Sequence, residues 1–382
     1  MKKISPDTLV ILIALVLYMP FLFLGYGSDN DTYKVLWTGS YFVRTLDYVP
    51  SRGPGFFVFE TITFFLNALG GSLLTNISVM GMSLVTLYSF LRLCRQFDVP
   101  NSPLLGLILA VHPYYWVNST CTMDYLFALG FTFLGILQVL RGKYFTAGAA
   151  MALGAGSRAT AVLISAGFLI WYYLTQAQAR KLLIQTGAAA IFFTLVFYLP
   201  PASFTEWRMR FLKLSVGGEE FWTPYLRLGR FVYKNLYFWG PLAALMLGWA
   251  LVVGVFKRRF FAQPNQRGLA LLALGVLLAY EALYLGVPIE PAYLLPTVPF
   301  WLILTGMAFK PDRKPLYLLL AGLLIANFVS INVARPNVVN KATGAIYGLW
   351  IEPGHLVEDT KTRLEYIACG NWPCNWTGQT LE

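Results

Sequence analysis

Charged residues are scarce in this chain of 382 residues, because only 12% are Asp, Glu, Lys or Arg whereas 57% are hydrophobic. Soluble globular domains carry roughly 25% charged residues, so the composition excludes that class. Hydrophobic runs recur from end to end with short polar breaks, which predicts an all-α polytopic membrane protein. The net charge of +11 lies in loops between these runs and therefore indicates topology rather than nucleic-acid binding.

Histidines, cysteines and nucleotide-binding motifs are equally scarce. The two histidines, His112 and His355, have no His partner at helical spacing, which excludes a His-rich metal site. No local motif supports Ser-His-Asp chemistry, and neither a Walker loop nor a GxGxxG turn is present. Cys369 and Cys374 lie in a polar tail, where their spacing fits a disulfide loop on an oxidising side.

The hydrophobic runs predict eleven membrane spans. They cover residues 7–25, 73–93, 103–117, 122–140, 144–157, 160–175, 182–199, 236–255, 268–286, 292–309 and 315–332. The further run at 56–70 has only about 15 residues, short of the roughly 20 that a span needs. We expect it to be a juxtamembrane helix on the outer side.

With this assignment, basic loop residues gather on the inner side of the membrane. They are Lys2, Lys3, Arg92, Arg95, Arg141, Lys143, Arg180, Lys181, Lys257, Arg258, Arg259, Arg267, Lys310, Arg313 and Lys314. The positive-inside rule then places the N-terminus in the cytoplasm and the C-terminus outside. The chain divides into a transmembrane domain (1–332), with outer loops at 26–72 and 200–235, and a small extracytoplasmic tail (333–382).

Carboxylates mark the points where the chain leaves the membrane on the outer side. Asp29 and Asp31 follow the first span directly, and ionisable groups beside hydrocarbon are functional candidates, although Asp is also common in solvated turns. Asp124 begins the run at 122–140, where it either stabilises the helix dipole or serves the site. Arg52, in the turn that ends the first loop, is either a headgroup anchor or a partner for a phosphate or carboxylate.

Arginines form the second set of candidates. Arg158 lies between two hydrophobic runs near the outer face, so it needs a partner in space, either a phosphate or an outer carboxylate. Arg227, Arg230 and Lys234 are spaced to share one helix face. That face either meets anionic lipid headgroups at the interface or clamps the phosphate of a lipid-linked substrate.

The order of these features resembles the GT-C glycosyltransferases, polytopic enzymes that take sugars from polyprenyl-phosphate carriers. The greatest similarity is to the protein O-mannosyltransferase and lipid A aminoarabinose transferase branch. The acidic motif that opens the first outer loop in that branch resembles Asp29-Asn30-Asp31-Thr32-Tyr33. Other similar segments are Arg52-Gly53-Pro54, Thr122-Met123-Asp124, Ser157-Arg158 and Glu290-Pro291-Ala292-Tyr293-Leu294-Leu295-Pro296.

The resemblance implies a GT-C-like fold of about eleven transmembrane helices with juxtamembrane helices in the first outer loop. It also implies inverting transfer of a sugar from a polyprenyl-phosphate-linked donor to a glycan, lipid or protein acceptor, outside the inner membrane of a bacterium. Asp29 would be the general base. Asp31 would be a reserve base, or would join Asp29 in binding a divalent cation, Mg²⁺ or Mn²⁺, as some members require. The expected substrate-binding residues are Tyr33, Arg52, Asp124, Arg158, Arg227, Arg230, Glu290 and Tyr293.

Two other functions remain open at this point. A lipid-linked glycan polymerase or ligase is also polytopic with basic outer loops, although a carboxylate pair in the first outer loop argues against it. A transporter or flippase needs charge deeper within the spans. Glu281 is the one clear acid at mid-span, and inverted repeats are not visible in the sequence.

The expected position of the run at 56–70 predicts how a cysteine placed just after it will react. In Ser72→Cys protein, a membrane-impermeant maleimide added outside intact cells should label position 72, because the whole loop 26–72 stays outside. The unsubstituted chain gives the background labelling. Labelling that appears only after permeabilisation would mean that the run crosses the membrane.

Overall fold

The computed structural model describes residues 4–52, 56–204, 224–310, 312–335 and 346–370, and most of these are helical. The first helices are α1 (Pro6–Tyr18), η1 (Met19–Phe23), α2 (Asn30–Thr45), α3 (Phe57–Gln96), α4 (Ser102–Val111), α5 (Pro113–Asn118), α6 (Asp124–Leu140) and α7 (Tyr144–Ser157). Next come α8 (Ala161–Thr175), η2 (Ala177–Ala179), α9 (Arg180–Phe204), α10 (Pro224–Trp239), α11 (Pro241–Phe256) and η5 (Arg259–Phe261). The last elements are α12 (Pro264–Gly286), η6 (Pro291–Thr297), α13 (Val298–Ala308), α14 (Lys314–Phe328), the antiparallel strands β1 (Val329–Arg335) and β2 (Ile346–Pro353), and α15 (His355–Ala368).

Several helices are long and apolar enough to cross a membrane. Within the described ranges five qualify by length and composition, or six if the bent pair α10–α11 is one span. On α9 the side chains of Ile191, Phe192 and Leu195 are 60–65% exposed. Large exposed apolar surfaces of this kind are rare on soluble monomers, so they indicate contact with lipid. The chain is an integral membrane protein.

The predicted count of eleven spans stays a prediction, since the helices are broken at several points. The run at 103–117 is divided between α4 and α5, because Pro113 has no N–H to continue the helical ladder and His112 has a ψ of 127°. Helix α3 breaks at Gly70 and Gly71, and Gly71 has a φ of 59°, a conformation that favours glycine. Residues 57–69 therefore form a helical segment of their own.

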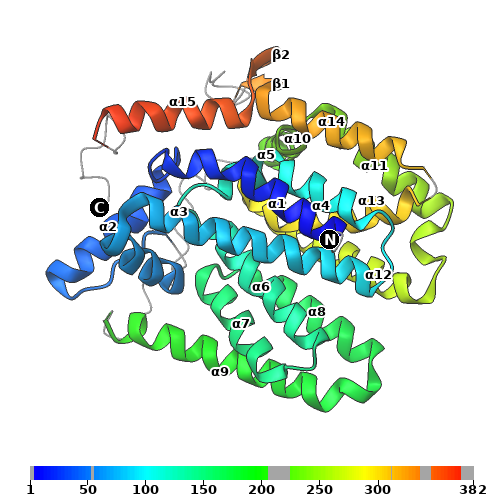
Figure 1. The fold of residues 1–382 in the computed structure, drawn as a ribbon, viewed down its shortest axis with the longest axis horizontal. Coiled ribbons are helices and arrows are strands. Elements are labelled where there is room, and N and C mark those ends of the chain that lie inside the picture. Colours follow the sequence, from blue (N-terminus) through cyan, green and yellow to red (C-terminus); the bar gives the residue numbers. More distant parts are fainter. Residues whose placement is uncertain (1–3, 53–55, 205–223, 311, 336–345, 371–382) are drawn as a thin grey trace.

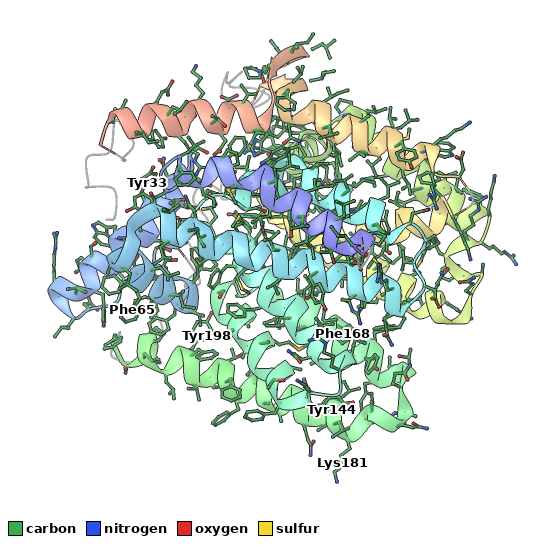
Figure 2. All side chains as sticks on the ribbon, in the orientation of Figure 1. Tyr33, Phe65, Tyr144, Phe168, Lys181 and Tyr198 are labelled. Atoms are coloured by element: carbon green, nitrogen blue, oxygen red, sulfur yellow. The ribbon has the colours of Figure 1, made fainter. Side chains whose placement is uncertain are left out.

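This segment carries apolar side chains that face outward. Phe65 is 60% exposed and Leu69 is 78% exposed (Figure 2). Exposed aromatic and aliphatic residues on a short helix suit a segment that lies in the membrane interface, as expected for the run at 56–70.

Small residues let α7 pack closely between α6 and α9, in the lower part of Figure 1. A Cβ on Gly148 would lie 2.7 Å from the carbonyl oxygen of Thr186 on α9, and one on Gly154 would lie 3.1 Å from that of Ala128 on α6. Close approach of this kind is the usual basis of helix association in membranes. Because α6 and α7 are joined by a short turn, the end of α7 returns to the beginning of α6.

The tail folds back onto the helical domain. Figure 1 shows α15 on the same side of the molecule as α14 and α10, away from α7 and α9. The predicted domain boundary at 332/333 falls within β1. Cys369, just after α15, is disulfide-bonded, whereas Cys374 lies outside the described residues.

Gly354, which starts α15, touches the end of α14. Its amide donates a hydrogen bond of 2.8 Å to the carbonyl oxygen of Phe328. A Cβ at this position would lie 2.4 Å from the backbone of Asn327 and Phe328, with no flexible side chain to move aside.

We expect Gly354→Ala to lower the stability of the protein by about 1–3 kcal/mol, because overpacking against backbone forces α15 away from α14. Thermal unfolding in detergent measures the effect. Gly275→Ala is the matched control, because a Cβ on Gly275 would meet no atom within 4 Å. Equal melting temperatures for the two variants would contradict the prediction.

Candidate active site

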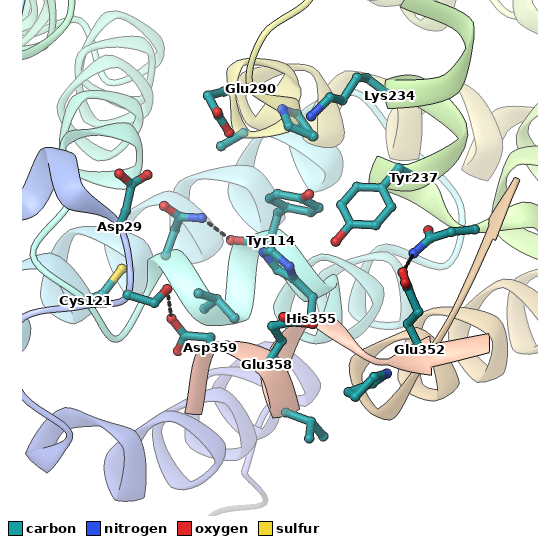
Figure 3. A pocket seen from close by; sticks show the side chains of 18 of the residues that line it. Asp29, Tyr114, Cys121, Lys234, Tyr237, Glu290, Glu352, His355, Glu358 and Asp359 are labelled. Carbon is teal, nitrogen blue, oxygen red and sulfur yellow. Dashed lines mark hydrogen bonds between the residues drawn. The ribbon is translucent and has the colours of Figure 1, made fainter. Parts of the chain in front are cut away.

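A cavity of about 830 Å³ opens between the first outer loop, α5, α10, β2 and α15 (Figure 3). Its ionisable lining includes Asp29, Lys234, Glu290, Glu352, His355 and Asp359. The volume is ordinary for a small-molecule site, for which roughly 300–1,000 Å³ is typical. The fold therefore brings both ends of the chain to one polar cavity.

Asp29 lies on the wall of this cavity, across from Glu290 and Lys234 (Figure 3). It is the N-cap of α2, and its Oδ1 accepts a hydrogen bond of 2.8 Å from the amide of Asp31. Reduced hydration at the cavity wall raises the pKa of Asp29 above its ordinary value of 3.8, and the charge of Asp31 raises it further, although part of Asp29 stays exposed. A carboxylate with a raised pKa is the better proton acceptor.

The surroundings of Asp31 move its pKa in the opposite direction. Its Oδ1 lies 2.9 Å from the Lys34 ammonium and its Oδ2 lies 2.9 Å from the Arg52 guanidinium. Burial alone would raise the pKa of Asp31, but the charges of Arg52 and Lys34 outweigh it and lower the pKa. Two neighbouring carboxylates with pKa values pushed apart are typical of a site that needs one of them to exchange a proton.

Asp124 joins two arginines at the first turn of α6. Its fully buried carboxylate lies 2.6 Å from Arg52 and 2.5 Å from Arg158. The α6–α7 packing explains the second contact, because Arg158 directly follows α7. The partner in space that Arg158 was expected to need is therefore Asp124, which also contacts Arg52.

Aromatic rings cover the two guanidinium groups. The Arg158 guanidinium carbon lies 4.0 Å from the ring centre of Tyr125 and 5.2 Å from that of Tyr293. The Arg52 guanidinium carbon lies 4.6 Å from the ring centre of Phe56. Such cation–π contacts stabilise the two buried charges beside the Asp124 carboxylate.

Sequence reasoning missed Glu60, which holds the turn that carries Arg52. Its buried carboxylate accepts hydrogen bonds from the Ser51 amide (2.8 Å), the Ser51 hydroxyl (2.5 Å) and the Tyr48 hydroxyl. The available signal was an acid in the first turn of an apolar helix, where an unpaired charge is costly.

Tyr33 does not line the cavity, as is also true of Asp31, Arg52, Asp124, Arg158 and Tyr293. Its side chain is 1% exposed, and its hydroxyl donates a hydrogen bond of 3.1 Å to the carbonyl oxygen of Gly27. The ring packs edge-on against Tyr26 and Tyr366, between α2 and α15 (Figure 2). Its position supports the loop rather than a substrate.

Helix α10 reaches the cavity through Lys234, whereas Arg227 and Arg230 do not line it. The mid-span acid of the transporter alternative, Glu281, accepts a hydrogen bond of 3.2 Å from Asn235 on α10. That contact ties Glu281 to a neighbouring helix.

The tail contributes lining residues that the sequence did not single out. His355 stacks on Tyr114, with ring centres 4.0 Å apart. Burial lowers the pKa of His355 to about 4, against the opposing charge of Asp359, so its imidazole is neutral near pH 7. Glu352 of β2 also lines the cavity (Figure 3). The amphipathic pattern of α15 was the available signal.

No family model and no curated protein matches the chain. Two solved structures are similar to it: the crystal structures of ArnT from Cupriavidus metallidurans in the apo state and bound to undecaprenyl phosphate. They are 14% and 17% identical to it, each with a TM-score of 0.55, over 79% of this chain. The chain has the GT-C fold. It spans about 60% of the length of these structures, of which 59% and 60% are covered.

The carboxylates do not fit a divalent cation. Both oxygens of Asp31 are occupied by Lys34 and Arg52, which place positive charge where the ion would lie. Among the described residues no group of three or more acids, histidines or cysteines could hold a metal.

We expect Asp124→Asn to be much more destabilising than Asp31→Asn. Removing the charge of Asp124 takes away the carboxylate that pairs with Arg158, whose side chain is only 9% exposed, and breaking a buried pair of this kind costs about 3–5 kcal/mol. The Asp31 side chain is 21% exposed, and Arg52 keeps Asp124 when Asp31 is neutral. Melting temperatures in detergent compare the variants. A larger loss of stability in Asp31→Asn than in Asp124→Asn would contradict the expectation.

Proposed function

We propose that the chain is an inverting membrane glycosyltransferase that takes a sugar from a polyprenyl-phosphate-linked donor and transfers it to an acceptor on the extracytoplasmic face of a bacterial inner membrane. The observation that carries the proposal is the carboxylate of Asp29 at the wall of a polar cavity, two residues before Asp31, which is paired with Lys34 and Arg52. The GT-C fold, and undecaprenyl phosphate bound to one similar structure, support a lipid-linked donor.

Asp29 is the general base in this proposal. Its ionised carboxylate faces the cavity, and no Lys or Arg of the described chain pairs with it. It takes the proton of an acceptor hydroxyl while the hydroxyl oxygen attacks the anomeric carbon of the donor. The bond from that carbon to the phosphate oxygen breaks on the opposite face of the sugar, which gives inversion. General-base assistance of this kind contributes typically ~10²–10⁴-fold.

Arg158 and Arg52 stabilise the phosphate that leaves. Arg158 contacts Asp124 through Nη1, and a guanidinium has five N–H donors, so in this proposal the remaining ones serve the phosphate. Fixed cations lower the barrier when they meet charge that develops in the transition state. Asp124 holds the two arginines through its two carboxylate oxygens, and Glu60 fixes the turn of Arg52.

The remaining residues bind the sugar and the acceptor. Lys234 and Glu290 lie on the wall across from Asp29, where they can donate to and accept from sugar hydroxyls. Tyr293 packs against Arg158 and contributes apolar surface beside the phosphate. Arg227 and Arg230 lie beyond the cavity wall, where they meet anionic headgroups at the membrane surface.

The decisive experiment is transfer of radiolabel by purified protein from polyprenyl-phosphate sugars to a membrane extract that contains acceptors. We expect Asp29→Asn to lower turnover by at least ~10²-fold, because the amide cannot accept the proton. Binding of undecaprenyl phosphate should be unchanged, since Asp29 does not hold the phosphate. Asp47→Asn, an exposed acid of the same loop, is the matched control. Full turnover in Asp29→Asn would refute the assignment of the base.

The pH dependence of kcat/KM provides a second test. Activity should fall at acid pH with a midpoint above 3.8, because protonated Asp29 cannot act as a base and its pKa is raised. In Asp31→Asn the midpoint should move to lower pH, since the neighbouring negative charge that raises the pKa of Asp29 is gone. An unchanged or higher midpoint in a folded Asp31→Asn variant would mean that another group sets the acid limb.

A further inference from the structure

Arg363 of α15 is buried completely within the protein, with 0% of its surface exposed. Its Nη2 donates hydrogen bonds to the carbonyl oxygens of Phe21 (2.8 Å), Gly25 (3.3 Å) and Thr120 (2.9 Å). Its Nε donates to the carbonyl oxygen of Leu24 at 3.0 Å. A buried guanidinium with this many backbone acceptors fixes the segments that supply them.

These acceptors come from two segments that lead to the acids of the site. Residues 21–25 end η1 and precede Asp29, and Thr120 precedes Asp124. The amide of Thr122 also donates a hydrogen bond of 2.7 Å to the carbonyl oxygen of Tyr26, which joins the two segments directly. One side chain of the tail therefore holds the approaches to both carboxylates.

Asp359 extends the contact to the residue next to Asp29. Its Oδ2 lies 3.3 Å from Nη1 of Arg363, one helical turn away. Its Oδ1 accepts a hydrogen bond of 2.6 Å from the hydroxyl of Ser28, and Figure 3 shows Asp359 below Cys121, near Asp29. These contacts link Arg363 to Asp359 and Asp359 to Ser28, and Ser28 is joined to Asp29 by a peptide bond.

The segment before Asp29 needs such support. Gly25 and Gly27 have φ values of 73° and 151°, and glycine loses more conformational freedom on ordering than any other residue. Without outside contacts, two glycines this close to the N-cap would leave the direction of the Asp29 carboxylate poorly fixed. A general base must be held within hydrogen-bond reach of its proton.

We infer that Arg363 and Asp359 are positioning residues for Asp29, so that the C-terminal helix α15 is an essential part of the catalytic site. The inference rests on the proposed role of Asp29 as general base. It assigns to the tail a function in the chemical step beyond that of lining the cavity.

Three variants test the inference, in the same transfer assay. Ser28→Ala removes the contact of 2.6 Å with Asp359 and little else. Asp359→Asn removes the charge that pairs with Arg363, and Arg363→Lys keeps the charge but loses the planar fork that reaches several carbonyl oxygens. Leu364→Ala is the control, because Leu364 neighbours Arg363 on α15 with its side chain 52% exposed.

We expect kcat to fall by ~10–10²-fold in the three variants, with the KM for the donor nearly unchanged, because small displacements of a catalytic group have effects of this size. The midpoint of the acid limb of kcat/KM should also move toward pH 3.8 in Ser28→Ala. The reason is that an Asp29 carboxylate that is held less firmly is better hydrated, which lowers its raised pKa. A purely structural role would lower the melting temperature without moving this limb.

The outcomes separate the two proposals. If Asp29→Asn is inactive while folded Ser28→Ala and Asp359→Asn keep the kcat and acid limb of the unsubstituted protein, the positioning inference is wrong and the proposed function stands. If Asp29→Asn is fully active, the general-base assignment and the positioning inference fall together. Loss of kcat in Leu364→Ala equal to that in Ser28→Ala would also overturn the inference.

Discussion

The buried carboxylate of Asp124 is the interaction on which the rest of the site depends. It places one negative charge between two guanidiniums, at the positive end of a helix and out of contact with water. Arg158 would not be tolerated at this depth without it, since an unpaired buried charge costs several kcal/mol, whereas Arg52 also pairs with Asp31. Because Arg52 comes from the first outer loop and Arg158 from the end of α7, this one carboxylate joins three parts of the chain.

Two further buried charges complete the frame. Glu60 receives hydrogen bonds from the turn before Arg52, and Arg363 donates to the segments before Asp29 and Asp124. Each is a charged side chain whose partners are largely backbone groups or hydroxyls, so each fixes the course of a loop rather than the position of another charge. The site of the proposed reaction therefore lies on loops. These loops are fixed by Glu60 of α3 and by Arg363 of α15.

Much of the fold class and part of the site could be predicted from the sequence. Hydrophobic runs reveal membrane helices because lipid imposes length and composition on each one separately. Asp29, Asp124 and Arg158 stand out for the same reason, since charge near hydrocarbon is costly wherever it occurs. The need of Arg158 for a partner followed from the cost of its charge, with a phosphate and an outer carboxylate both open, and the structure supplies Asp124. The parts that could not be predicted depend on contacts between distant segments. Tyr33 belongs to the acidic motif, but its burial against Tyr366 depends on where α15 lies. Arg363 has no unusual sequence neighbours, and its role follows from carbonyl oxygens more than three hundred residues earlier in the chain.

The contacts of Arg363 also constrain the number of times that the chain crosses the bilayer. Phe21 and Leu24 lie where the first span ends, and α15 follows the end of α14 by way of the β1–β2 hairpin. These two helix ends must be on the same face of the membrane, so the chain crosses an even number of times between them. In the topology expected from the sequence, with α1 in the first span and α14 in the last, the total is then odd. Eleven crossings satisfy this parity, whereas adding the run at 56–70 as a twelfth would place α15 across the bilayer from the loop that it holds.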